Sequence, residues 1–352
     1  MSRDVSLDIT KGFAIICVIL GHSEELGVPT SLVNAIFTFH MPLFFIVSGY
    51  FTRHDAVLDR ECVVRCARST LLPYAITCAI VLMLLAVRTL LLWPEGLADV
   101  MGTMSLAALY GTGTLEPPLP SGVTMIGAIW FLLALFWAKL FLAAANRSPY
   151  APVVILVLFL WGYYSGWMFW LPLSVQAGAC ATLFLFLGQK IRKCGLLAPG
   201  RLSPLLWLIA AGMWLACINM GYKLVMASNA YPGDVVVDVL GGVCGALCVI
   251  KLSQLLYRHL PVLGRPLAWL GTITLPIFCM HLTEMDVFLW EQVVAWLSAL
   301  PVPLWVSGLA LRVALIAAMC GVLYALPHPI SGVFYRSRVR CWAIPHAGLI
   351  RR

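Results

Sequence analysis

The sequence has little charge for its length. Of its 352 residues, 11% are Asp, Glu, Lys or Arg, whereas 62% are hydrophobic. Soluble globular domains carry roughly 25% charged residues, so water could not solvate the surface of this chain over its whole area. The composition therefore excludes a cytosolic enzyme, a secreted disulfide scaffold and a disordered chain, and it predicts an integral membrane protein.

The sequence also lacks cysteine patterns that bind metals or form disulfides. All twelve cysteines fall in predicted spans or inner segments and none in an outer loop, and there is no Cys-x-x-Cys pair. Cys62/Cys66 and Cys244/Cys248 are each one helical turn apart without further candidate ligands beside them. We therefore expect neither disulfides nor a metal site.

Internal repeats are missing as well. No segment recurs at a fixed period, and no pair of interrupted hydrophobic runs occupies matching positions in two halves of the chain. Such pairs are typical of secondary transporters. Their absence counts against a transporter without excluding one.

What the sequence does have is a series of hydrophobic runs long enough to cross roughly 30 Å of hydrocarbon. We expect an all-α, polytopic membrane protein with about ten transmembrane helices. These helices would form a single domain over residues 1–335, and a basic tail would follow over 336–352. The ten predicted spans are 8–22, 34–52, 70–92, 124–143, 152–170, 173–189, 204–221, 236–255, 267–283 and 303–326.

The charges between these runs predict the topology. Counted from the N-terminus, the even-numbered connections and the tail carry nearly all the connecting arginines and lysines, whereas the odd-numbered ones collect Asp and Glu and contain one base, Lys223. Positive residues near spans stay in the cytoplasm, so both termini are predicted to be cytoplasmic. The outer segment 93–123 is rich in Gly and Pro, which predicts a loop or lid rather than a helix.

The first run carries a polar stripe of Asp8, Lys11 and His22. Charges inside a bilayer are costly, so they usually face a protein interior and are functional candidates. Helical periodicity places the three on one face, with Lys11 and His22 roughly 16 Å apart along the axis. They can cooperate only through a bound molecule or a polar passage. The alternative is that Asp8 and Lys11 form an ion pair at i, i+3 and His22 merely ends the helix.

Other polar residues flank later runs. His40 and His281 fall at the outer ends of the second and ninth runs, and Glu284 follows His281 by one turn. Glu284 could orient the imidazole of His281, or the two could form a solvent-exposed loop pair. Histidine is the side chain best suited to move a proton near neutral pH, so convergence of these histidines would indicate an outward site. Ser48 and Gly49 allow close helix packing.

The second connection contains a basic cluster that includes Arg65 and Arg68. The positive-inside bias accounts for most of it, but the same cluster would suit the phosphates of a large anionic donor. Arg88 and Arg312 fall within predicted spans, and the topology leaves them unexplained.

Several of these segments together resemble the acyltransferase-3 superfamily, in particular its fucose 4-O-acetylase-like branch. Family members have a basic residue and a histidine separated by ten residues in the first span, as Lys11 and His22 are. Many have Arg where Lys11 stands, a change that affects phosphate geometry more than charge. The resembling segments are 8–12, 19–23, 39–45, 48–51, 68–74, 128–132 and 272–281.

The resemblance implies ten transmembrane helices and transfer of an acyl group, usually acetyl from acetyl-CoA, to a hydroxyl of a cell-envelope or extracellular glycan. It also implies a bacterial inner-membrane location, with acetyl-CoA, a glycan or lipid-linked saccharide and the bilayer as partners. Acetyl-CoA would be a donor substrate, and no cofactor would be bound permanently. No nucleic-acid partner is expected.

Under this interpretation His22 is the general base or a covalent acyl carrier, and Lys11 acts with it. Arg65 and Arg68 would bind the donor. The supporting residues would be Asp8, His40, Ser48, Glu25 and His281. Glu25 is included because a carboxylate of the following loop, Glu24 or Glu25, could orient His22.

Two other classes of function stay open at this stage. A transporter for a solute or a lipid-linked sugar would use Lys11, Arg88 and Arg312 as pathway charges. A non-enzymatic anchor of a glycan-assembly complex would keep the fold but tolerate the loss of His22.

Overall fold

A computed structural model describes residues 4–53, 58–198 and 200–335. Within these ranges the chain is all-α, as predicted, and its only β-type pairing is an isolated bridge between Val225 and Ala230. The predicted basic tail over 336–352 lies outside the described residues.

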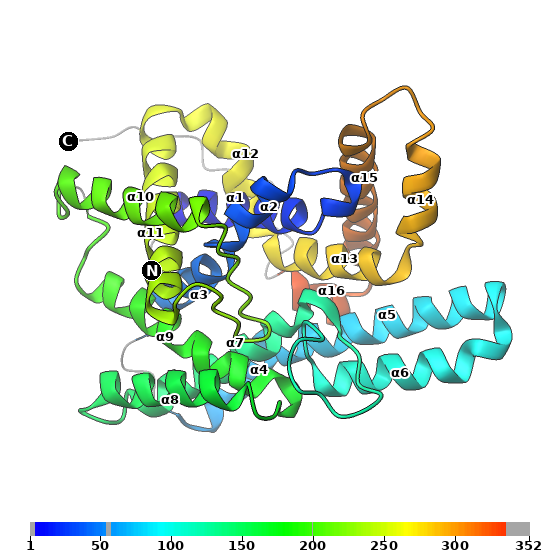
Figure 1. Ribbon diagram of the computed structural model, residues 1–352, viewed down its shortest axis with the longest axis horizontal. Helices are drawn as coiled ribbons and strands as arrows, with labels where there is room; N and C mark the ends of the chain where they lie inside the picture. The colour runs from blue at the N-terminus through cyan, green and yellow to red at the C-terminus, as the bar shows by residue number, and fades with distance from the viewer. Residues whose placement is uncertain (1–3, 54–57, 199, 336–352) are drawn as a thin grey trace.

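The described α-helices, shown in Figure 1, vary widely in length. They are α1 (Val5–Gly21), α2 (Thr30–Phe37), α3 (His40–Phe51), α4 (Arg60–Ser69), α5 (Leu71–Leu92), α6 (Leu97–Tyr110), α7 (Trp130–Ala145), α8 (Ala151–Ser165), α9 (Val175–Lys193), α10 (Pro204–Asn219), α11 (Val235–His259), α12 (Pro261–Thr272), α13 (Thr274–Val287), α14 (Trp290–Leu297), α15 (Leu304–Ala325) and α16 (His328–Phe334). Short 3-10 turns also occur, namely η1 (Glu24–Leu26), η2 (Pro94–Gly96), η3 (Gly127–Ile129) and η4 (Pro172–Ser174).

Six helical segments of the described chain are long and apolar enough to cross a membrane, and the bent pair α12 and α13 makes a seventh if it counts as one span. Each of the ten predicted runs overlaps a helix. However, α1, α8 and α10 have 17, 15 and 16 residues. At 1.5 Å per residue they reach only about 23–26 Å. The structure is consistent with a polytopic membrane protein, while ten spans and the location of the termini stay predictions.

The ninth predicted run is broken rather than straight. Its two halves, α12 and α13, meet at Ile273 with a bend of 69°. Pro276 is the third residue of α13, within the first turn, where backbone N–H groups lack intrahelical partners in any case. The proline is therefore tolerated at the start of a new helix, and the bend changes the direction of the segment that carries His281.

The outer segment 93–123 contains a helix, so the prediction of a loop throughout was wrong. Leu97–Tyr110 forms α6, which packs against α5 as a hairpin that projects from the molecule (Figure 1). The α6 sequence has no proline, and the Gly and Pro residues that suggested a loop gather after it. Gly111 ends the helix at φ 69°, a left-handed conformation that favours glycine.

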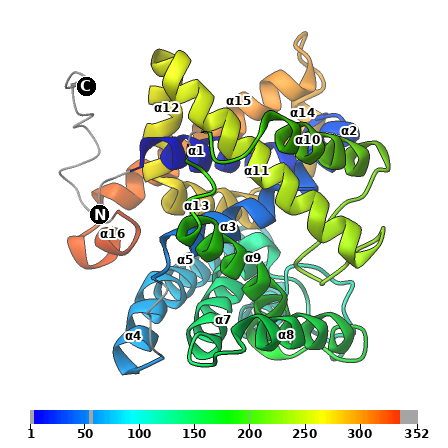
Figure 2. The same ribbon diagram turned by 90° about the vertical axis from the view of Figure 1, so that its left-hand side faces the viewer.

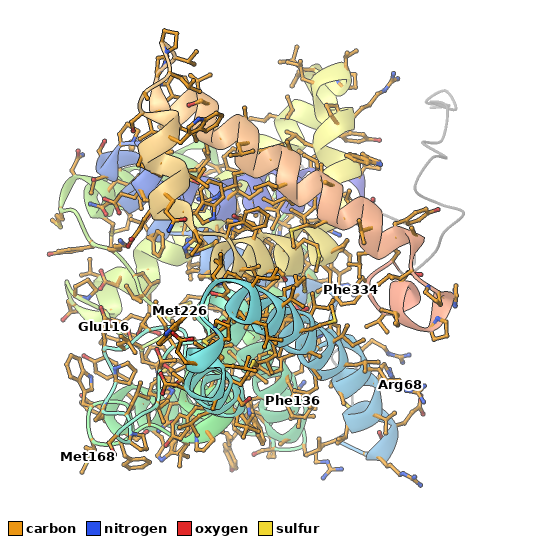
Figure 3. All side chains as sticks on the ribbon, turned by 90° about the vertical axis from the view of Figure 1, so that its right-hand side faces the viewer. Arg68, Glu116, Phe136, Met168, Met226 and Phe334 are labelled. Atoms are coloured by element: carbon orange, nitrogen blue, oxygen red, sulfur yellow. The ribbon has the colours of Figure 1, made fainter. Side chains whose placement is uncertain are left out.

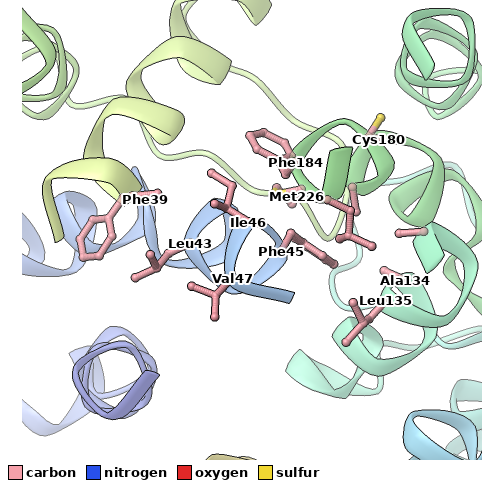
Figure 4. Close-up of a cluster of buried hydrophobic side chains, with 14 of the residues drawn as sticks. Phe39, Leu43, Phe45, Ile46, Val47, Ala134, Leu135, Cys180, Phe184 and Met226 are labelled. Carbon is pink, nitrogen blue, oxygen red and sulfur yellow. The ribbon is translucent and has the colours of Figure 1, made fainter. Parts of the chain in front are cut away.

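The largest hydrophobic cluster joins α3, α7 and α9. Figure 4 shows Phe45 of α3 and Phe184 of α9, both fully buried, with Ala134 of α7 in the same cluster. Gly49 allows this approach, because a Cβ atom there would lie 2.0 Å from the carbonyl oxygen of Leu185. In Figure 2, α9 lies between α3 and the pair α7 and α8.

A second close contact joins α1 to α12. A Cβ atom on Gly12 would lie 1.9 Å from the Leu267 carbonyl oxygen, and one on Gly271 would lie 1.9 Å from the Asp8 carbonyl oxygen. Small residues at such crossings let helix backbones touch. The polar stripe of α1 is therefore held directly against the broken ninth run.

The labelled residues of Figure 3 separate into two sides. Glu116, in the third predicted connection, and Met168, at the end of the fifth predicted run, lie on one side, and Arg68 and Phe334 lie on the other. This separation agrees with the alternation that the hydrophobic runs predict. Which side faces the cytoplasm stays a prediction.

Candidate functional site

The polar stripe of α1 is divided between its two ends. In the first turns, Lys11 Nζ lies 2.6 Å from Asp8 Oδ1, and Asp8 is buried. Lys11 Nζ also lies 5.8 Å from the ring centroid of Phe51, the last residue of α3. The i, i+3 ion pair is therefore present, and a role of Lys11 toward a donor stays a prediction.

His22 caps the other end of α1, where rings from distant segments meet. Its ring centroid lies 5.9 Å from that of His281 in α13 and 5.8 Å from that of Phe37 in α2. The Phe37 ring lies 4.8 Å from the ring of His40, the first residue of α3. The structure thus brings together the three histidines chosen from the sequence, in one set of ring contacts that we call the histidine cluster.

The ring nitrogens of the cluster are held differently. His40 Nδ1 lies 2.9 Å from the carbonyl oxygen of Ile36, which can only accept a hydrogen bond, so Nδ1 carries the proton. Among the described residues, no hydrogen bond reaches a ring nitrogen of His22, and the Nε2 atom of His281 has no partner either. The neighbouring rings of His22 and His281 therefore each keep an unused nitrogen.

His281 and Glu284 form a fully buried pair. Nδ1 of His281 lies 2.8 Å from Oε1 of Glu284, and neither side chain is exposed. The sequence spacing also allowed a solvent-exposed loop pair. The structure instead places both residues inside α13, where the carboxylate fixes the orientation of the imidazole ring.

Glu25 contacts an arginine rather than the ring of His22. Its Oε1 accepts a hydrogen bond of 2.7 Å from Nη2 of Arg312, a residue that the topology had left unexplained. Arg312 also donates to the backbone carbonyl of His22 and, at 2.8 Å, to Ser23 Oγ. Glu25 therefore reaches the histidine cluster indirectly, and Arg312 belongs to the site although sequence reasoning did not place it there.

Lys223 is a second residue that sequence reasoning did not assign to the site. Its Nζ lies 4.6 Å from the ring centroid of Phe37, beside the histidine cluster. Its loop is anchored by the buried Met226 and by Asn229, whose Nδ2 donates to the Gly162 carbonyl at 2.9 Å. The only available signal was that Lys223 is the single base in the odd-numbered connections.

Ser48 lies away from the histidine cluster. It follows His40 by eight residues in α3, a distance of about 12 Å along the helix axis. Its backbone carbonyl accepts a hydrogen bond of 3.0 Å from Thr52 Oγ1. The position next to Gly49, at the crossing with α9, fits a packing role.

The two arginines predicted to bind the donor lie at a groove on the Arg68 side of Figure 3. The groove has a volume of about 590 Å³, and α4, the start of α5 and α16 line it. Arg65 and Arg68 contribute to the lining with Ser69 and His328, and Arg65 Nη2 also pairs with Glu61 Oε1 at 2.8 Å. The groove presents positive charge and hydrogen-bond donors to an anion.

The described part of the chain contains no group of three His, Cys, Asp or Glu side chains arranged to hold a metal ion. The cysteines in that part are all free thiols.

The chain is similar to known acyltransferases. The acyltransferase domain of the acyltransferase-3 family matches residues 4–326. The nodulation protein NolL of Sinorhizobium fredii (strain NBRC 101917 / NGR234) is 29% identical to this chain over 144 residues. The aligned region covers 38% of this chain and 34% of NolL, so the chain spans about a third of the length of that curated relative. No solved structure matches the chain. The match over 4–326 favours an enzyme over a transporter or an anchor, and the chain belongs to the acyltransferase-3 family of membrane acyltransferases.

Proposed function

We propose that this acyltransferase moves an acetyl group from acetyl-CoA to a hydroxyl of a cell-envelope or extracellular glycan, in the bacterial inner membrane. The observation that carries the proposal is the histidine cluster, which lies in a chain matched by the acyltransferase domain. A sugar hydroxyl is a poor nucleophile until a base removes its proton, and imidazole is suited to that task near neutral pH.

Direct transfer would proceed in one displacement. A ring nitrogen of His22 takes the hydroxyl proton as the hydroxyl oxygen attacks the thioester carbonyl carbon, and the carbon–sulfur bond breaks. The imidazolium then returns the proton to the departing thiolate of CoA. The absence of a protein hydrogen bond to the His22 ring, among the described residues, leaves its nitrogens available for this exchange.

A two-step route uses the same residue. A ring nitrogen of His22 attacks the thioester, an acyl-histidine forms and CoA leaves as the thiol. The glycan hydroxyl then attacks the acyl-histidine, gives up its proton and frees the imidazole. This route would allow a donor that enters from one side of the membrane to serve an acceptor on the other.

In this proposal the donor and the acceptor bind at different places, the donor at the arginine groove and the acceptor at the histidine cluster. The groove with Arg65 and Arg68 suits the phosphates of CoA. Lys11 is paired with Asp8 and lies near Phe51 at the end of α3, and in this proposal it attracts the donor as well. Lys223 and Phe37 lie at the histidine cluster and would meet the acceptor.

We expect Arg68→Ala to weaken acetyl-CoA binding about 10- to 100-fold, because one charge-assisted hydrogen bond contributes roughly 1.5–3 kcal/mol. Lys11→Ala should weaken it as well, and Lys11→Arg should do so less, because the charge is kept. Calorimetric titration of the detergent-solubilised protein with acetyl-CoA measures these affinities. Arg258→Ala is the matched control, since Arg258 is an exposed arginine of α11 that does not line the groove.

The donor assignment fails if the wild type, Arg68→Ala and Lys11→Ala bind acetyl-CoA equally well. In that case Asp8 and Lys11 serve only as a structural pair, and Lys11→Ala would lower the folded yield and leave affinity unchanged. The assignment as an acyltransferase would survive that result.

Lys223→Ala is expected to raise KM for the acceptor glycan at least about fivefold with little change in kcat, because it removes a cation beside the cluster. The effect should shrink as salt is added, because Lys223 is half-buried and salt screens charges that water still reaches. Steady-state kinetics at two ionic strengths measure both. Lys251→Ala is the control, since Lys251 lies 5.2 Å above the Trp207 ring in a similar geometry in α11. Equal KM values for both variants would remove Lys223 from the acceptor site.

The proposed function itself is tested by mass spectrometry of envelope glycans from cells with and without this chain. In cells that contain the chain, we expect the glycan mass to rise by one acetyl group in place of one hydrogen. Mild alkali should remove this added mass, because it cleaves esters. Identical glycan masses in the two strains would refute the acetylation of an envelope glycan.

A further inference from the structure

Arg312 is a buried charge in the middle of a predicted membrane helix. It lies in α15, is 0% exposed and is the largest of the fully buried side chains. A guanidinium that leaves water loses several kcal/mol of hydration, so it persists only where partners satisfy its donors. Charges within spans are usually functional for this reason.

The guanidinium joins the two segments that carry His22 and His281. On one side, Nη1 donates to the His22 backbone carbonyl and to Ser23 Oγ. On the other side, Nε forms an ion pair of 3.0 Å with Glu284 Oε1, although its N–H makes no hydrogen bond within the described part of the chain. The same Oε1 atom lies 2.8 Å from His281 Nδ1. One planar group therefore ties the end of α1 to the carboxylate that orients the His281 ring.

The contacts of Glu284 determine which nitrogen of His281 carries the proton. Oε2 of Glu284 accepts a hydrogen bond of 2.7 Å from Trp290 Nε1, and Oε1 faces Arg312. Tryptophan donates but cannot accept, so Oε2 is an acceptor. The permanent positive charge of Arg312, 3.0 Å from Oε1, favours the ionised carboxylate, so Oε1 is an acceptor as well. The hydrogen between Glu284 and His281 therefore belongs to Nδ1, and Nε2 keeps its lone pair.

The ring that carries this lone pair lies beside the ring of His22. Nε2 of His281 is buried and has no hydrogen-bond partner in the described part of the chain. Its ring centroid lies 5.9 Å from that of His22. The Trp290 ring, from α14, stacks on the guanidinium group. Cζ of Arg312 lies 4.4 Å from the centroid of that ring.

We infer that Arg312 is a positioning residue that holds His22 and His281 in one acid–base site through the His22 carbonyl and through Glu284. The inference rests on the proposed function, because it assigns a part in the acyl transfer. It predicts that Arg312 affects the rate of the chemical step and leaves the binding of either substrate unchanged.

The first test is Arg312→Lys, which keeps the charge but offers one ammonium instead of a fork that reaches both segments. We expect kcat to fall about 100-fold, a typical contribution of acid–base groups, with KM for acetyl-CoA and acceptor within about threefold. Arg88→Lys is the matched control. Arg88 lies in α5 and donates to the Val287 carbonyl at 2.7 Å, at the end of the helix that carries His281, yet it touches none of the histidines.

The second test approaches the same link from its other end. Glu284→Gln keeps the size of the side chain but adds donors, and it should lower kcat about as much as Arg312→Lys. In the double variant the two losses should not multiply, because both changes break one connection. The Glu284→Gln variant tests the positioning role even if Arg312→Lys gives too little folded protein.

The inference is overturned if Arg312→Lys or Glu284→Gln retains a kcat within about threefold of the wild type, or if the losses multiply in the double variant. A merely structural role would lower folded yield and leave the kcat of the surviving protein unchanged. A wild-type protein that transfers no acyl group would instead refute the proposed function, so the two failures are distinguishable.

Discussion

His22→Ala is expected to lower kcat by about 10²- to 10⁴-fold, the range that general acid–base groups contribute. Membrane abundance should stay near that of the wild type, because His22 ends a helix and lies on its polar face, so truncation removes little packing. The measurement is the rate of acetyl transfer by purified variants. The matched control is His259→Ala, which removes an exposed histidine at the end of α11.

The same variant separates the two chemical routes. If His22 carries the acyl group, wild-type protein given labelled acetyl-CoA without acceptor should retain label after denaturation, and His22→Ala should not. If His22 acts only as a base, neither protein retains label. Activity of His22→Ala within a few-fold of the wild type would remove His22 from both roles.

The second large effect concerns folding. Gly12→Leu should destabilise the protein by at least about 3 kcal/mol, because overpacking at a helix crossing forces the backbones apart. Even the Cβ atom would lie 1.9 Å from the Leu267 carbonyl oxygen, and backbone cannot rotate away as a side chain can. We expect little folded protein in a thermal-stability assay by size-exclusion chromatography.

The control for this variant is Gly321→Ala in α15, where a Cβ atom meets nothing within 4 Å. Alanine favours a helix by roughly 1 kcal/mol over glycine, so this change should be neutral or stabilising. If Gly12→Leu were as stable as the wild type, the close packing of α1 on α12 would be wrong.

Much of the site depends on contacts within one helix, which a sequence reveals. The Asp8–Lys11 and His281–Glu284 pairs are both three residues apart, and helical spacing brings such residues together. The hydrophobic runs likewise located a helix at each predicted span. These features follow from the chain's local geometry.

The contacts that assemble the site are long-range, and no local pattern contains them. Arg312 donates to the His22 carbonyl, 290 residues away in the sequence. Lys223, in the loop between α10 and α11, contacts the ring of Phe37 in α2. The prediction of a loop over 93–123 was wrong because it used the composition of the whole segment. The Gly and Pro residues after Gly111 hid the helix α6, which precedes them.

The most direct test of the account uses sealed membrane vesicles that contain the protein, with radiolabelled acetyl-CoA supplied on the side of the Arg65 and Arg68 groove. We predict that label appears as an alkali-labile ester on glycan with wild-type protein and is absent with His22→Ala, while both proteins bind acetyl-CoA. Uptake or flipping of a solute without consumption of acetyl-CoA, or equal labelling by the two proteins, would contradict it.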